Sequence, residues 1–142
     1  MTVDTITWDA LTEGAEIPVL TKTPTPMQLF MFSAATWNRH LIHYSSEFAR
    51  SDGLKNVAVH RALLGGFLAQ MITDWLGSDG RLASLEWSVR GSAAIDRPLT
   101  CHGKIVERFA EGDKKFARCE VEVRNHEGER IVPGLAVVEF LR

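Results

Sequence analysis

The sequence predicts an α+β domain in which a curled antiparallel sheet wraps around one long buried helix. Residues 60–76 are apolar around nearly the whole circumference of a helix, and after Gly80 apolar residues alternate with polar ones. The 142 residues, of which 45% are hydrophobic and 24% charged, have the composition of an ordinary globular protein. We therefore expect a single domain over residues 1–142.

The first helices are predicted from prolines and capping residues. The segment 17–32 is extended and rich in proline, which excludes a helix before Pro26. Thr25 is a suitable N-cap with proline at the first helical position, and predicts a helix over residues 26–35. A second, short helix is predicted over residues 45–50, capped by a serine. The apolar side chains that the first helix is expected to bury are Leu29, Phe30 and Phe32.

The central helix is predicted over residues 60–76 and ends at Gly77. A helix that is apolar nearly all round belongs in the interior of a protein. Gly65 and Gly66 lie within it, although each glycine costs about 1 kcal/mol relative to alanine. We therefore expect another backbone or a ligand to approach the helix closely at these two positions.

Four strands are predicted after the helix, from the period-two alternation of apolar and polar residues. They span residues 85–90, 99–105, 117–124 and 131–141. Turn residues at 111–113 and 125–128 make the last strands antiparallel neighbours, and Pro133-Gly134 predicts a bulge or bend. A sheet wrapped in this way around the helix, with its polar face toward water, is a hotdog fold, one of several α+β arrangements that the pattern allows.

Charge and composition exclude several classes of protein. The formal net charge of -2 offers no basic surface for nucleic acid. Residues 1–12 lack both the positive charge and the apolar run of a signal peptide, and the apolar stretch 62–75 is too short and interrupted to span a membrane. The two cysteines, Cys101 and Cys119, are expected to be small buried side chains. We expect a cytoplasmic protein.

Residues 33–44 form a loop with an unusual concentration of polar side chains between the first two predicted helices. The loop contains Asn38, Arg39, His40 and His43. Loops on a rigid scaffold often carry functional residues, but Asn and His side chains also stabilise loops, and composition leaves both interpretations open. His40 and His43 could share a metal ion, but a third ligand at suitable spacing is missing, so no metal site is expected.

This loop and the start of the central helix resemble the MaoC-like hydratases and dehydratases, a family that includes the (R)-specific enoyl-CoA hydratases. The family has a loop of the form Asp-x-Asn-Pro-x-His-x-Asp, then a short helix, then His-Gly-x-Leu. In this chain His43 aligns with the histidine, Asn38 stands five residues before it, and residues 59–63 match the helix start. The resemblance covers residues 17–140 and is nearest to the mesaconyl-CoA hydratase-like branch.

The resemblance implies a hotdog fold and the reversible addition of water to a 2-enoyl thioester. It implies that His43 is the catalytic base and that Asn38 lies beside it, either holding the water or fixing the ring. A histidine titrates near neutral pH, which suits a base for water. No cofactor is implied. The substrate is expected to be an acyl-CoA or an acyl-carrier-protein thioester.

The resemblance also implies a substrate-binding set around the start of the central helix. The backbone N–H groups of Arg61 and Ala62 would point toward the thioester oxygen from the positive end of the helix dipole. The other residues implied to bind substrate are His60, Gly65, Gly66 and Arg39. The acyl chain would lie along the two glycines, and an arginine could meet the phosphates of the carrier.

Arg61 is the main departure from the family, because it stands where the motif has glycine. It favours an alternative in which the chain is a non-catalytic or half-site subunit of a heteromeric hydratase. Two lesser alternatives are a hotdog thioesterase, for which Asp74 is too near the helix end, and a binding module without chemistry. Hotdog chains generally pair, so we expect a homodimer or a heteromer with another MaoC-like chain.

Overall fold

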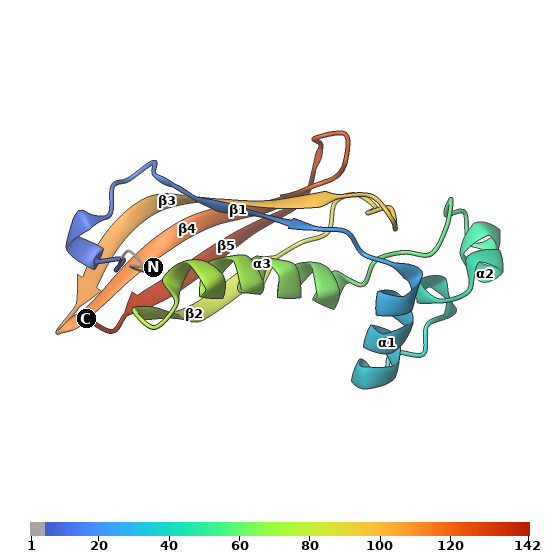
Figure 1. Ribbon diagram of the computed structural model, residues 1–142, viewed down its shortest axis with the longest axis horizontal. Coiled ribbons are helices and arrows are strands. Elements are labelled where there is room, and N and C mark those ends of the chain that lie inside the picture. The colour runs from blue at the N-terminus through green and yellow to red at the C-terminus, as the bar shows by residue number, and fades with distance from the viewer. Residues whose placement is uncertain (1–4) are drawn as a thin grey trace.

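The computed structural model describes residues 5–142 and has the curled sheet and central helix of a hotdog domain (Figure 1). Residues 1–4, part of the segment for which no signal peptide is expected, lie outside the described residues. The five strands are β1 (Glu16–Lys22), β2 (Gly80–Trp87), β3 (Leu99–Glu111), β4 (Lys114–Arg124) and β5 (Arg130–Phe140). They follow one another in the order β1-β3-β4-β5-β2, and all neighbours are antiparallel.

The central helix α3 (Arg61–Leu76) lies along one face of this sheet, as expected from its sequence. Its buried residues are Leu63, Leu64, Gly65, Phe67, Leu68, Met71, Ile72 and Leu76. The inward positions of β3 and β4 include Cys101 and Cys119, both fully buried, and burial raises the pKa of each thiol to about 12. The prediction that these cysteines are core side chains is confirmed. No helix in residues 5–142 is long and apolar enough to cross a membrane.

The 3-10 turn η1 (Trp8–Ala10) lies at the C-terminal end of α3, and the other three helical elements gather beyond its N-terminal end, away from the sheet (Figure 1). They are α1 (Pro26–Thr36), the 3-10 turn η2 (Leu41–His43) and α2 (Ser46–Ser51). Both predicted caps are confirmed: Thr25 Oγ1 accepts a hydrogen bond from the N–H of Gln28, and Ser45 Oγ accepts one from the N–H of Phe48. The expected burial of Phe30 is wrong, because α1 extends past the sheet and leaves this ring 57% exposed.

Two strand predictions are corrected by bulges. β2 begins at Gly80 rather than residue 85, because an extra residue between Leu82 and Ser84 interrupts its period-two pattern. Pro133 and Gly134 are in regular register with β4, and the irregularity of β5 lies near Ile131 instead. The carbonyl of Pro133 accepts a hydrogen bond from the N–H of Ser88 over 3.1 Å, one residue beyond the last β2–β5 pair, Trp87 with Gly134. The proline therefore lies where the regular pairing of these two strands ends.

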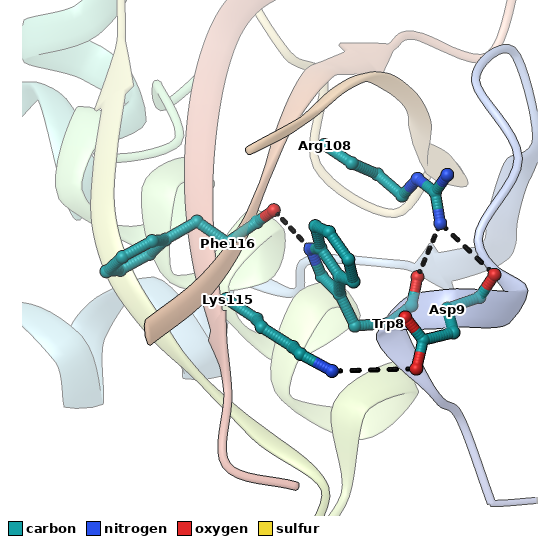
Figure 2. Close-up of polar contacts among 5 residues, drawn as sticks. All are labelled: Trp8, Asp9, Arg108, Lys115 and Phe116. Carbon is teal, nitrogen blue, oxygen red and sulfur yellow. Dashed lines mark hydrogen bonds and ion pairs between the residues drawn. The ribbon is translucent and has the colours of Figure 1, made fainter. Parts of the chain in front are cut away.

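The N-terminal segment around Trp8 packs against the end of the sheet near the C-terminus of α3 (Figure 1), and Figure 2 shows its polar contacts. The indole Nε1–H of Trp8 donates to the carbonyl of Phe116 over 2.8 Å. Arg108 donates to the carbonyls of Trp8 and Asp9, and Lys115 Nζ lies 3.5 Å from an Asp9 carboxylate oxygen. The Arg108 and Lys115 cations also lie 5.0 and 5.2 Å from the indole ring. We call these five residues the Trp8 clamp.

Candidate active site

His43 lies on η2 and is 9% exposed. Its Nδ1 is 2.7 Å from the carbonyl oxygen of Ala58. A carbonyl can only accept a hydrogen bond, so Nδ1 carries the proton of the neutral ring and the lone pair is on Nε2. The structure therefore holds His43 in the tautomer in which Nε2 can act as a base.

The ring of His43 stacks on that of His60, the residue that precedes α3. The ring centroids are 3.8 Å apart and the planes differ by 17°. His60 is 1% exposed, so this contact is made inside the protein. It joins the loop that carries His43 to the N-terminal end of the central helix.

Ser33 on α1 contacts the Nε2 edge of the His60 ring and was not among the residues predicted from the sequence. Its Oγ lies 2.7 Å from His60 Nε2, and Ser33 itself is 6% exposed. The ring of Phe32 meets His60 edge-on at 4.8 Å. His60 Nδ1 is buried and has no hydrogen-bond partner within the described part of the chain. The only sequence signal for Ser33 was a polar residue within the otherwise apolar run from Leu29 to Ala35.

Burial, and secondarily the charge of His43, lower the pKa of His60 to about 4. His60 is therefore neutral at neutral pH. Two stacked imidazolium rings would repel each other strongly, so any proton gained during a reaction belongs to the other ring of the pair. The arrangement gives one ring that is available for proton transfer and one that is not.

The N-terminal end of α3 supplies backbone donors beside this pair. The N–H of Leu64 makes the first intrahelical bond, to the carbonyl of His60, and the preceding N–H groups belong to Arg61, Ala62 and Leu63. Arg61 and Ala62 are exposed. Unpaired N–H groups and the helix dipole favour an anionic oxygen at this position.

The side chain of Arg61 is tied to the edge strand β2. Its Nη2 donates to the carbonyl of Trp87 over 3.2 Å, and the indole N–H of Trp87 donates back to the carbonyl of Arg61 over 3.0 Å. The same indole fills the space at Gly65, where a Cβ would lie 2.3 Å from the ring. A Cβ at Gly66 would meet nothing within 4 Å. The close approach expected at the two glycines is found at Gly65 and comes from Trp87, while Gly66 faces open space.

The described contacts of Asn38 and Arg39 lie within their own loop. Asn38 Oδ1 accepts a hydrogen bond from the N–H of His40 over 3.2 Å, and the ring of His43 is held by Ala58 instead. The exposed Arg39 lies over the ring of Trp37, 5.9 Å from its centroid. Among residues 5–142 no group of three His, Cys, Asp or Glu side chains is placed to hold a metal ion.

A cavity of about 590 Å³ opens beside His43. Its other lining residues include Met27 and Phe30 of α1, Tyr44, Arg50 of α2 and Ile95. It therefore combines a histidine, apolar side chains, one cation and the carboxylate of Asp96. A larger hollow of about 740 Å³ lies on the polar face of the sheet, where the Lys104–Glu120 pair is part of its lining. His43 does not line this hollow.

Comparison with known protein families agrees with this geometry. The family model described as hydroxyacyl-thioester dehydratase type 2 matches residues 11–91, which include the His43 loop and all of α3. Acyl-thioester hydratase or dehydratase chemistry, expected from the sequence, is the chemistry of that family. No curated protein matches the sequence at a significant level.

Several solved structures share the fold, and they confirm the hotdog fold expected from the sequence. The (R)-hydratase from A. caviae involved in PHA biosynthesis superposes with a TM-score of 0.82 at 20% identity, covering 91% of this chain and 96% of that one. The ChsH1-ChsH2 complex from Mycobacterium tuberculosis gives 0.80 at 20% identity, with coverages of 91% and 98%. The MaoC-like dehydratase from Rhodospirillum rubrum gives 0.76 at 16% identity, with coverages of 94% and 95%.

Proposed function

Because the chain belongs to the hydroxyacyl-thioester dehydratase type 2 family, we propose that it adds water reversibly to a 2-enoyl thioester with His43 as the base. The product is a 3-hydroxyacyl thioester. The observation that supports this role is the hydrogen bond from His43 Nδ1 to the Ala58 carbonyl, which leaves the lone pair on Nε2. General acid–base catalysis needs such a positioned and correctly protonated side chain.

The reaction requires one proton to be taken from water and one to be given to the substrate. Nε2 of His43 accepts a proton from water as the water oxygen bonds to C3 of the enoyl group. The electron pair of the double bond moves toward the thioester oxygen, where the N–H groups of Arg61 and Ala62 stabilise the enolate. The His43 imidazolium then returns its proton to C2. Asn38 has no ionisable proton, and its proposed role is to hold the water.

The cavity beside His43 suits an acyl chain lined by Met27 and Phe30. Gly66 is the proposed point where the chain passes α3, because Trp87 already fills the space at Gly65. His60 forms part of the wall behind His43. Arg39 and Arg61 are the cations proposed to meet the phosphates of coenzyme A or of an acyl-carrier protein. The acyl group itself is left open.

We propose that the protein works as a homodimer, with a heteromer as the alternative. Supporting association, Met27, Phe30 and Met31 leave much of α1 apolar and more than half exposed. The half-site alternative is favoured by Arg61, since its side chain occupies a motif position that has glycine elsewhere in the family. The unpaired thiols of Cys101 and Cys119 fit a reducing compartment, the proposed cytoplasm.

The proposal is tested by hydration of crotonyl-CoA, a long-chain enoyl-CoA and a ring-bearing enoyl-CoA, followed as loss of enoyl-thioester absorbance. We expect turnover of at least one substrate, and a fall in kcat/KM of about a hundredfold or more in His43→Ala. His126→Ala, which removes an exposed histidine on the β4–β5 turn, should leave the rate unchanged.

A folded protein that turns over none of the three thioesters contradicts the homomeric proposal. Native mass spectrometry of the protein purified from its own cells then tests the half-site alternative, which requires a second chain of similar mass. Full activity in His43→Ala would contradict the assignment of the base whatever the oligomeric state.

A further inference from the structure

We propose that Ser33 and His60 form a positioning pair that fixes the ring of His43 for proton transfer. The proposal rests on the proposed function of His43 as the base. It assigns a role to Ser33, which lies on α1, 27 residues before His60, and which neither the motif nor the reaction itself requires.

The first step is the direction of the hydrogen bond between Ser33 and His60. Within residues 5–142 the Ser33 hydroxyl bonds only to His60 Nε2, and His60 Nδ1 has no partner. If His60 donated from Nε2, both the hydroxyl hydrogen and the Nδ1 lone pair would be unpaired. If Ser33 donates to Nε2, only the Nδ1–H is unpaired. Because unpaired buried polar groups are costly, Ser33 is the donor and His60 carries its proton on Nδ1.

The second step is the effect on the ring of His43. Its edge is fixed by the Ala58 carbonyl, and its face is fixed by the stacked ring of His60. The His60 ring is fixed in turn by Ser33 and by the edge of Phe32. Proton transfer depends steeply on such orientation, because small misplacements of a reacting group cost large factors in rate.

The third step concerns charge. The Ser33 hydroxyl occupies the only lone pair on the His60 ring nitrogens, which opposes protonation of His60. A neutral His60 allows the His43 ring stacked upon it to become positively charged, whereas a charged one would repel it. α1 has no charged residue, and Arg61 is tied to Trp87. The other ionisable groups that face the pair in the described structure are the His40 ring, 6.0 Å from that of His43, and Tyr44, Arg50 and Asp96, which line the cavity beside His43.

The chain offers matched variants for a test. Ser33→Ala removes the donor, and Ser33→Cys replaces it with a weak donor of similar size, which guards against loss of folding. His60→Phe keeps a ring against His43 but removes the acceptor. Thr36→Ala is the control, because Thr36 is a hydroxyl residue on the same helix whose one side-chain hydrogen bond within residues 5–142 is donated to the carbonyl of Phe32.

We expect Ser33→Ala, Ser33→Cys and His60→Phe each to lower kcat by about tenfold without a change in KM. The double variant Ser33→Ala/His60→Phe should be no slower than either single variant, since all remove the same hydrogen bond. Thr36→Ala should match the wild type. Additive losses in the double variant, or a loss in KM alone, would overturn the proposal.

A second readout does not depend on catalysis. Nitrogen-15 NMR of the imidazoles should show His60 protonated on Nδ1, and Ser33→Ala should raise the titration midpoint of His60 by about 0.7 pH unit. If this signature is present while no thioester is turned over, the proposed function fails and the hydrogen-bond assignment stands. If His60 is instead protonated on Nε2, the positioning pair is wrong even in an active enzyme.

Discussion

At the C-terminal end of α3 the polar groups of the Trp8 clamp are paired, whereas at the N-terminal end some polar groups have no partner among residues 5–142. The Trp8 indole donates to Phe116 and lies between two cations. At the other end His60 Nδ1 is buried and has no partner in the described part of the chain, and the N–H groups of Arg61 and Ala62 precede the first helical bond. Both ends belong to the same helix and the same sheet (Figure 1).

The difference indicates where stability and where function reside. A buried polar group without a partner costs about 1–3 kcal/mol, so its retention at one end only calls for a role there. Apolar exposure is concentrated at the same end: Met27, Phe30, Met31 and Trp37 are all more than half exposed. The polar groups of the clamp are paired with one another, whereas the His43 end combines an unpaired buried nitrogen of the described structure with exposed apolar side chains.

The largest effect that we expect is that acid lowers the free energy of unfolding through His60, at the His43 end of α3. The pKa of His60 is about 4 in the folded protein and 6.5 as a free side chain, so the unfolded chain takes up a proton first as the pH falls. The lowered pKa of His60 therefore makes the free energy of unfolding depend on pH. This free energy is highest above pH 6.5 and falls by up to about 3 kcal/mol as the pH is lowered toward 4. Urea unfolding at several pH values between 7 and 4 measures the slope of the free energy of unfolding against pH. His60→Phe should flatten it, and an identical slope in the variant would contradict the assignment.

The two central glycines offer the next largest effect and a matched pair. Gly65→Ala places a Cβ into the Trp87 ring and should lower the free energy of unfolding by about 1–3 kcal/mol. Gly66→Ala meets open space and should raise it by about 0.5–1 kcal/mol, because alanine favours the helix. Chemical denaturation of both variants gives the comparison. Equal destabilisation by the two substitutions would show that Trp87 does not occupy the space at Gly65.

The smallest expected effect tests the clamp. Trp8→Phe keeps an aromatic ring near Arg108 and Lys115 but loses the hydrogen bond to the Phe116 carbonyl. The free energy of unfolding should fall by about 1 kcal/mol. A thermal or urea midpoint equal to that of the wild type would mean that the clamp contributes nothing through this bond.

The helices and most of the sheet could be predicted because their signals are local. The caps at Thr25 and Ser45 depend on residues within one helical turn. The apolar surface of α3 likewise depends on a continuous stretch of sequence. The first half of β2 was missed because the bulge between Leu82 and Ser84 breaks the alternation on which strand prediction depends.

The site was predictable only in part, for a related reason. His43 and His60 carry a sequence pattern, but the partners that fix them do not. Ala58 contributes a backbone carbonyl, which any residue has, and Ser33 reaches His60 across 27 residues. Gly65 signalled a close approach without revealing that Trp87 would make it. Contacts between distant segments depend on the packed fold rather than on the composition of either segment.

We expect catalysis to depend on the His43 end of α3, whereas the Trp8 clamp contributes stability. This division is tested most directly by measuring kcat/KM for an accepted enoyl-CoA and the free energy of unfolding in His43→Ala and Trp8→Phe. At equal folded fraction, His43→Ala should lose about a hundredfold or more in kcat/KM, while Trp8→Phe loses stability and keeps its activity. An active His43→Ala protein, or a folded Trp8→Phe protein that has lost its activity, would contradict this account.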